Sequence, residues 1–102
     1  MTSLLEKHRA ELAAVCRKFG VERLDAFGSG TRADFNPGKS DLDFVVRFVG
    51  PHGRGYADRY LALAEALEKL FARRVDLLTE RSLRNPILQR VVAADRQNLY
   101  AS

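Results

Sequence analysis

The strongest constraint on this chain is a glycine-rich turn followed by a strand that begins with two acids. The turn is Phe27-Gly28-Ser29-Gly30-Thr31-Arg32, and the strand opens with Asp41-Leu42-Asp43. Side chains alternate between the two faces of a strand, so Asp41 and Asp43 point the same way, while the apolar residues that alternate with them can enter a core. The pattern therefore predicts two carboxylates side by side at the start of a buried strand.

Two carboxylates this close repel each other, and one is pushed toward protonation unless a cation lies between them. Oxygen ligands of this kind suit magnesium. The small residues of the turn let backbone N–H groups approach an anion closely, as phosphate-binding turns do. A helical turn expected over 29–34 would add its dipole, with Arg32 in reach of a phosphate oxygen. Together these features predict a metal-dependent phosphoryl- or nucleotidyl-transfer site.

This combination resembles the signature of the polymerase-beta-like nucleotidyltransferases, in which Gly28-Ser29 and a spacer precede Asp41-x-Asp43, with an apolar residue after each acid. The length and layout are similar to the minimal nucleotidyltransferase (MNT) group of that superfamily. Members of this group are typically the antitoxins of HEPN/MNT toxin–antitoxin pairs. The resemblance also implies a third carboxylate on a later strand, and Asp76, in the apolar run Val75-Asp76-Leu77-Leu78, matches it.

The resemblance implies a role for each of these residues. Gly28 and Ser29 would form the triphosphate-binding turn, and Arg32 would contact a phosphate. Three catalytic carboxylates would hold two magnesium ions, with ATP as the nucleotide donor: Asp41, Asp43 and Asp76. The last of these would be a metal ligand, or the base, on the side of the attacking hydroxyl.

Two neighbouring residues bear on this site. Many family members have glycine where Ala33 follows Arg32, a departure that bears on rate and nucleotide preference. Asp25 lies on the strand expected over 21–27, whose core-facing side the pattern leaves open. It is a backup metal ligand, although a residue in such a place is more often simply exposed.

The alternation and periodicity of apolar residues predict helices over 3–19, 56–73 and 86–95, and strands over 21–27, 42–48 and 74–79. Asn85-Pro86 is a good helix start, and the last helix would use Ile87, Leu88, Val91 and Val92. Residues 98–100 are read as a tail. This order predicts an α+β fold, a small mixed sheet with helices packed on one face, as in the nucleotidyltransferase palm. The acids would converge on the uncovered face.

The bulk composition bounds the kinds of protein this chain can be. Its 102 residues predict a single minimal nucleotidyltransferase domain, 1–102, without room for a separate substrate domain. No apolar run is long enough for a membrane span, and the single cysteine, Cys16, fits a reducing, cytoplasmic compartment. The net charge of +4 is mild and its basic residues are scattered, so a nucleoside triphosphate is expected as a partner and direct nucleic-acid binding is not.

Three functions from different classes fit the sequence. The leading hypothesis is an antitoxin that transfers AMP from ATP to a tyrosine or other hydroxyl group of a cognate HEPN ribonuclease toxin. The second is an antitoxin that neutralises its toxin by binding alone, with idle acids. The third is a nucleotidyltransferase subunit acting on a small molecule. A homodimer and a complex with a HEPN-type toxin protein are both compatible with the sequence.

Overall fold

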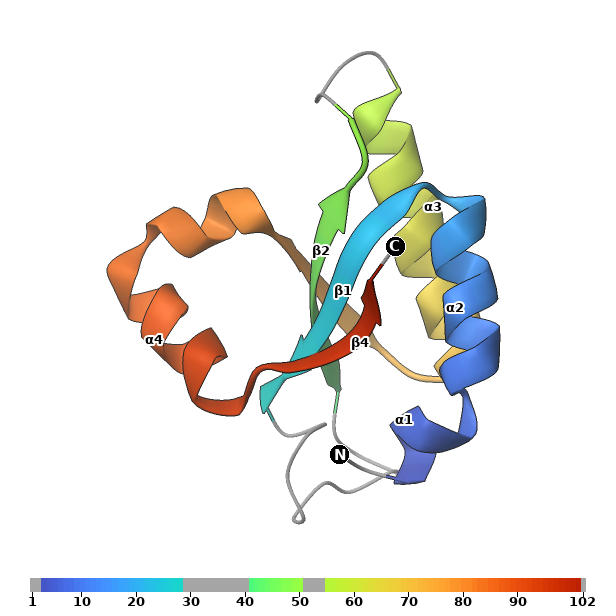
Figure 1. The fold of residues 1–102 in the computed structure, drawn as a ribbon, viewed down its shortest axis with the longest axis horizontal. Coiled ribbons are helices and arrows are strands. Elements are labelled where there is room, and N and C mark those ends of the chain that lie inside the picture. The colour runs from blue at the N-terminus through green and yellow to red at the C-terminus, as the bar shows by residue number, and fades with distance from the viewer. Residues whose placement is uncertain (1–2, 29–40, 51–54, 102) are drawn as a thin grey trace.

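The computed structural model describes residues 3–28, 41–50 and 55–101, and within them four strands form one mixed sheet (Figure 1). The strands are β1 (Val21–Phe27), β2 (Leu42–Phe48), β3 (Val75–Thr79) and β4 (Gln97–Ala101). Their order across the sheet is β3-β2-β1-β4. β1 runs antiparallel to both neighbours, and β2 and β3 are parallel. The predicted α+β fold with a small mixed sheet is confirmed.

The helices are α1 (Ser3–Lys7), α2 (Arg9–Lys18), α3 (Tyr56–Phe71) and α4 (Pro86–Asp95), with a 3-10 helix, η2 (Glu80–Arg84), after β3. The expected first helix is thus divided at His8, and α3 ends two residues early because Ala72 adopts a left-handed conformation, with φ 54°. Gly20 ends the first helical segment with φ +68°, as expected. In the described part of the chain, no helix is long and apolar enough to cross a membrane.

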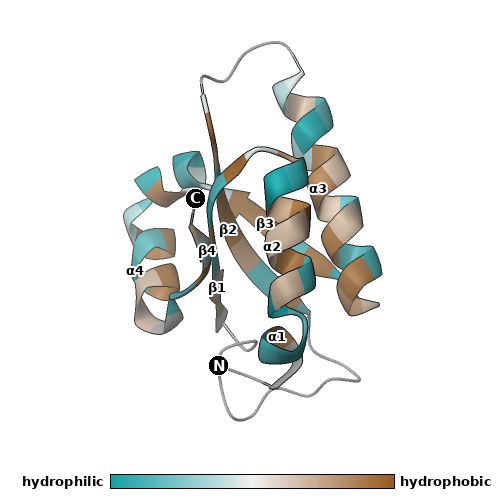
Figure 2. Ribbon diagram, turned by 45° about the vertical axis from the view of Figure 1, so that its right-hand side comes forward, coloured by the Kyte–Doolittle hydropathy of each residue, from teal (hydrophilic) through white to brown (hydrophobic). Residues whose placement is uncertain are grey.

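One face of the sheet carries the main core, where α2 and α3 pack side by side (Figure 2). Alternate residues of β2 point into it and are buried: Leu42, Phe44, Val46 and Phe48. The helices contribute buried residues at helical spacing: Leu12, Cys16, Leu63, Leu67 and Phe71. Burial raises the pKa of the Cys16 thiol to about 12, so Cys16 is an inert core residue, as expected from its place on the apolar stripe.

The opposite face carries a second, smaller cluster, built where α4 and η2 return to the sheet. Phe27 and Val45 pack there with Leu83 and Val92. The expectation of helices on one face therefore holds for α2 and α3, whereas α4 lies on the other face. Ile87 and Val91, expected in the core, are 76% and 52% exposed because only one narrow side of α4 meets the sheet.

The start of α4 follows the expectation from Asn85-Pro86. The Asn85 side-chain oxygen accepts hydrogen bonds from the backbone N–H groups of Ile87 and Leu88, at 2.9 and 3.4 Å. These bonds satisfy two of the N–H groups that a helix start leaves without partners. Asn85 thus fixes the position at which the chain turns back toward β1 after η2.

Strand β4 is the element that the sequence reading missed. Residues 98–100 were expected as a tail, but Gln97–Ala101 pairs with the free edge of β1. Leu99 is the single buried residue of this strand, so its pattern is too polar to indicate a strand by itself. The pairing depends on an open edge of β1, which local patterns do not reveal.

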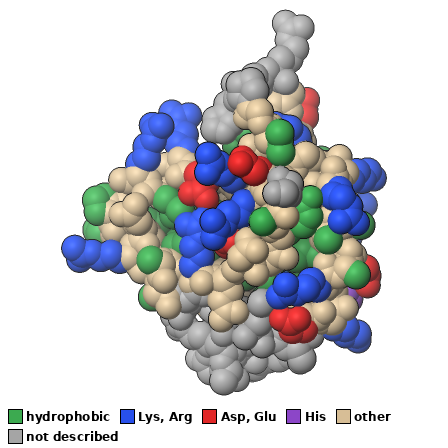
Figure 3. Space-filling model, viewed as in Figure 1, with side chains coloured by type: hydrophobic (Ala, Val, Ile, Leu, Met, Phe, Trp, Pro, Cys, Tyr) green, Lys and Arg blue, Asp and Glu red, His purple; other side chains and the backbone are tan. Residues whose placement is uncertain are grey.

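A buried carboxylate joins β4 and η2 to β1. Asp25 is fully buried, which corrects the expectation of an exposed side chain. The Arg23 Nε atom donates to both of its oxygens, at 3.1 and 3.0 Å, and the Asn98 amide donates at 2.9 Å. Arg96 donates to Asp25 through Nε and to Glu80 through Nη2, the latter at 2.7 Å. Figure 3 shows basic and acidic side chains gathered together near the middle of this view, over β1 and β4.

These donors decide the charge of Asp25. Burial by itself would raise the pKa of the carboxyl, but the hydrogen bonds from Asn98, Arg96 and Arg23 outweigh it and lower the pKa below 3.8. A lowered folded-state pKa stabilises the fold above the unfolded-state pKa, and this stabilisation is lost as pH falls through the folded-state value. The network is therefore complete at neutral pH and weakens only in strong acid.

We expect Asp25→Ala to lower the free energy of unfolding by about 3–5 kcal/mol, because the change leaves a partly buried Arg96 without its carboxylate. The matched control is Glu22→Ala on the same strand, which removes an exposed pair with Arg47 and should cost less than about 1 kcal/mol. Urea denaturation at pH 7 measures both. Equal losses in the two variants would show that the Asp25 network does not hold β4 and η2 in place.

Candidate active site

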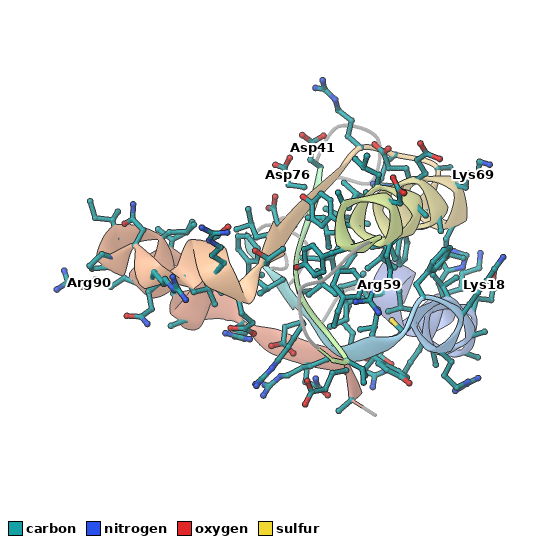
Figure 4. The ribbon with its side chains drawn as sticks, turned by 90° about the horizontal axis from the view of Figure 1, so that it is seen from above. Lys18, Asp41, Arg59, Lys69, Asp76 and Arg90 are labelled. Carbon is teal, nitrogen blue, oxygen red and sulfur yellow. The ribbon has the colours of Figure 1, made fainter. Side chains whose placement is uncertain are left out.

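The structure brings the three predicted acids together at one end of the sheet. Asp43 of β2 is in register with Asp76 of the parallel strand β3, so both side chains lie on the same face. Asp41 immediately precedes β2, where the Leu42 N–H donates to the Arg74 carbonyl at 3.1 Å and aligns the starts of the two strands. Asp41 and Asp76 project from the same region of the fold in Figure 4.

The surroundings of Asp43 make it the most perturbed of these acids. Its pKa is raised from 3.8 to about 6, first by burial, then by the charge of Asp76 and a hydrogen bond with it, and last by the charge of Asp41. Asp76 is exposed, while Asp41 and Asp43 are half-buried. Asp43 thus lies beside two like charges, and a proton or a cation there would relieve the repulsion.

Gly28, at the end of β1, lies directly against Asp43. It has φ +68°, a conformation that residues with a side chain rarely adopt, and a Cβ atom built on it would stand 2.6 Å from the Asp43 Oδ2 atom. The predicted turn therefore begins beside the acid cluster. Two other residues expected to bind phosphate, Ser29 and Arg32, lie outside the described residues, as does Ala33.

The donor set fits a divalent cation. Carboxylate oxygens are the ligands that magnesium prefers, and a cation would relieve the repulsion that raises the pKa of Asp43. Among residues that the structure describes, no three acidic, histidine or cysteine side chains already surround a common ion position.

Asp25 does not belong to the acid cluster. It lies opposite Val45 on β1, two residues before Phe27, which is the partner of Asp43. Both of its oxygens accept hydrogen bonds from arginine or asparagine side chains. The hypothesis that Asp25 is a backup metal ligand is therefore not supported, and its position indicates a role in stability.

Tyr60 is a residue near the acids that the sequence reading assigned only to the buried stripe of α3. Its hydroxyl donates a hydrogen bond to the Leu77 carbonyl, next in the chain to Asp76. Burial raises its pKa, and the charges of Tyr56 and Asp76 raise it further. The phenol, a polar group on an otherwise apolar stripe, was the signal that could have indicated a partner on β3.

Known proteins resemble this chain over most of its length. A family model described as a nucleotidyltransferase domain matches residues 9–99. A protein of Methanocaldococcus jannaschii named for protein adenylyltransferase activity is 33% identical over 92 residues, covering 90% of this chain and 87% of its own. Protein adenylyltransferase MntA of Thermococcus cleftensis is 33% identical over 90 residues, covering 88% and 84%.

The fold also matches a solved structure. A chain in the complex of a tri-AMPylated HEPN toxin of Shewanella oneidensis with an MNT antitoxin superposes with a TM-score of 0.66. The match covers 96% of this chain and 73% of that chain, at 18% identity. The arrangement of strands and helices is thus shared, while this identity by itself supports no more than the fold.

We expect Gly28→Ala to damage the site and Gly50→Ala to leave it intact. Both glycines have positive φ, +68° and +83°, so each change should cost about 1–2 kcal/mol in backbone strain. Only at Gly28 does the new methyl group meet a carboxylate, since a Cβ at Gly50 has no described atom within 4 Å. Calorimetric titration with Mn²⁺ should show weaker binding for Gly28→Ala alone. Equal affinities would contradict the close packing of Gly28 on Asp43.

We expect Asp76→Asn to lower the pKa of Asp43 from about 6 toward, but not fully to, its ordinary value, because burial remains when the neighbouring charge is removed. A ¹³C NMR titration of the carboxyl groups measures this, with Asp58→Asn on α3 as the control. Because the folded-state pKa of Asp43 is raised, the contribution of this residue to the free energy of unfolding is fully present below about pH 4 and is lost as pH rises through about 6. The free energy of unfolding should therefore fall over this interval, less steeply in Asp76→Asn.

Proposed function

The chain belongs to the nucleotidyltransferase domain family, and on this premise we propose that it is a protein adenylyltransferase that acts as an antitoxin. Its substrate would be a cognate HEPN-type toxin, which receives AMP from ATP on a hydroxyl group, that of a tyrosine. The names of its relatives support protein adenylylation, and the fold shared with a chain of an MNT–HEPN complex supports this kind of partner.

The observation that carries the proposal is the joint placement of Asp41, Asp43 and Asp76 beside Gly28. Neighbouring carboxylates, of which Asp43 has its pKa raised by the charges of the other two, suit a reaction that handles a polyphosphate with divalent cations. In the proposed enzyme these acids would hold two magnesium ions, which when bound neutralise the triphosphate and make the acceptor hydroxyl a better nucleophile. The acids would then act by positioning the cations and by supplying the negative charge that holds them.

The reaction exchanges one phosphorus–oxygen bond for another. The acceptor oxygen bonds to the α-phosphorus of ATP, and the bond from that phosphorus to the oxygen bridging to the β-phosphate breaks. AMP remains on the acceptor and pyrophosphate leaves with the bonding electron pair. Asp76, the exposed acid of the cluster, would accept the proton of the acceptor hydroxyl.

Backbone groups at the end of β1 would hold the outgoing phosphates. Gly28 has no side chain between its backbone and the acid cluster, so a phosphate group can approach there as in other phosphate-binding turns. Ser29 and Arg32 are proposed to continue this contact, through a hydroxyl and backbone donor and a guanidinium group. Removal of positive charge at Arg32 should therefore weaken binding of ATP.

We expect Asp41→Ala/Asp43→Ala to abolish AMP transfer. The wild-type chain, the product of the adjacent gene as the candidate HEPN protein, ATP and magnesium are incubated together, and intact-mass spectrometry counts AMP adducts on that protein. Asp58→Ala, an exposed acid on α3, should behave as wild type. The double variant should lose at least about a hundredfold in rate, since it lacks two groups that stabilise the transition state.

Other outcomes of the same experiment identify the alternatives. A stable complex without a mass change, neutralised equally well by the double variant, would establish an antitoxin that acts by binding alone. Adenylylation of small hydroxyl compounds, with no adduct on the HEPN protein, would establish the small-molecule enzyme instead. Either result contradicts the proposed function.

A further inference from the structure

A pocket of about 390 Å³ lies between the first turns of α3 and the outer edge of β3. Its walls are mostly apolar and aromatic, with Tyr56 and Tyr60 from α3 and Leu77 and Leu78 from β3. Arg81 and Ser82 of η2 line it as well. This volume and lining are typical of sites that bury an apolar or aromatic group and orient it with a few polar ones.

The pocket shares strand β3 with the acid cluster. Leu77 and Leu78 follow Asp76 directly in β3, and the hydroxyl of Tyr60 donates to the Leu77 carbonyl. Thr79, which also lines the pocket, lies three residues beyond Asp76. Since a strand rises about 3.3 Å per residue, the pocket extends to about 10 Å from that acid. A ligand that contacts both Asp76 and the Thr79 side of the pocket must therefore be larger than the reacting hydroxyl alone.

The sheet order indicates which substrate approaches this side. Gly28 ends β1, the acids start β2 and β3, and the pocket lies beyond β3. In an in-line displacement the attacking oxygen and the leaving group stand on opposite sides of the phosphorus. With pyrophosphate leaving toward Gly28, the acceptor must enter from the side of β3. The pocket is thus on the acceptor side.

We infer that this pocket binds an apolar or aromatic side chain of a polypeptide acceptor, two to four residues along the chain from the hydroxyl that receives AMP. The inference rests on the proposed function and adds a determinant of acceptor choice. A polypeptide fits because an extended chain covers about 10 Å in three residues, which matches the rise along β3 from Asp76 to Thr79, a residue of the pocket wall.

Charge favours one further feature of this acceptor. Arg81 is the only charged side chain among the described residues that line the pocket, and it is exposed. An acidic residue next to the apolar side chain of the acceptor would pair with Arg81. A phosphate-rich ligand would instead contact a pocket lining that is mostly apolar. The pocket therefore suits an acceptor segment that combines an apolar side chain with a carboxylate.

Two variants with matched controls test the inference. Ala57 is an exposed lining residue on α3, so Ala57→Trp fills the pocket without disturbing the core. Glu65→Trp, two turns further along α3, adds an indole at an exposed position that does not line the pocket. Arg81→Glu reverses the charge at the pocket, and Arg84→Glu makes the same change in η2 outside it.

The measurements are the KM and kcat for the HEPN protein encoded beside this chain, the Kd of the complex with that protein, and the Kd for ATP. Ala57→Trp and Arg81→Glu should each raise the KM and the Kd for the HEPN protein by about tenfold. Their kcat and Kd for ATP should match wild type, and both control variants should match wild type throughout. Thermal melting checks that all four variants fold.

Two results would overturn the inference. One is a tenfold loss of affinity for ATP in Ala57→Trp, which would assign the pocket to the nucleoside of ATP. The other is equal behaviour of each pocket variant and its control toward the HEPN protein. If wild type attaches no AMP, the proposed function fails, but the Kd of the complex still decides whether the pocket receives a segment of that protein.

Discussion

The candidate site depends on the position of one carboxylate, that of Asp43. Pairing with the parallel strand β3 sets Asp76 beside it, and the end of β1 sets Gly28 against its oxygen. No residue with a side chain fits at Gly28 without moving the acid. The result is a half-buried carboxylate among like charges, with a pKa of about 6, that needs a proton or a cation. The left-handed glycine, the aligned starts of β2 and β3 and the predicted chemistry all follow from this placement.

Asp25 shows how the same side chain serves stability when its neighbours differ. It lies on the same face of the sheet, and it is more deeply buried than Asp43. Its neighbours are two arginines and an asparagine, which outweigh the cost of burial and lower its pKa. Asp43 has acids as neighbours, so burial and repulsion act in the same direction. Within one small sheet, hydrogen-bond donors make one aspartate structural, whereas acidic neighbours raise the pKa of the other and favour a cation beside it.

The site also has a direction across the sheet. The proposed phosphate-binding side is at the end of β1, the acids occupy the starts of β2 and β3, and the apolar pocket lies outside β3. An edge strand beside the proposed catalytic acids leaves room for a second macromolecule, and Tyr60 covers part of that edge through its hydrogen bond to the Leu77 carbonyl. A small domain of this kind has little surface with which to enclose an acceptor, so the inferred pocket supplies one defined contact close to the chemistry.

The sequence by itself determined the strands at 21–27 and 42–48, the Asn85 cap and the left-handed Gly20. These features are local, since each depends on alternation or turn chemistry, whereas Asp76 was joined to Asp41 and Asp43 through the resemblance to a known family. Only the tertiary structure decided that Gln97–Ala101 is a strand, that α4 covers the acid face and leaves Ile87 and Val91 exposed, and that Asp25 is buried. The physical reason is that each depends on a partner distant in the chain. The open edge of β1 selects β4, and Arg96, 71 residues beyond Asp25, makes it possible to bury that charge.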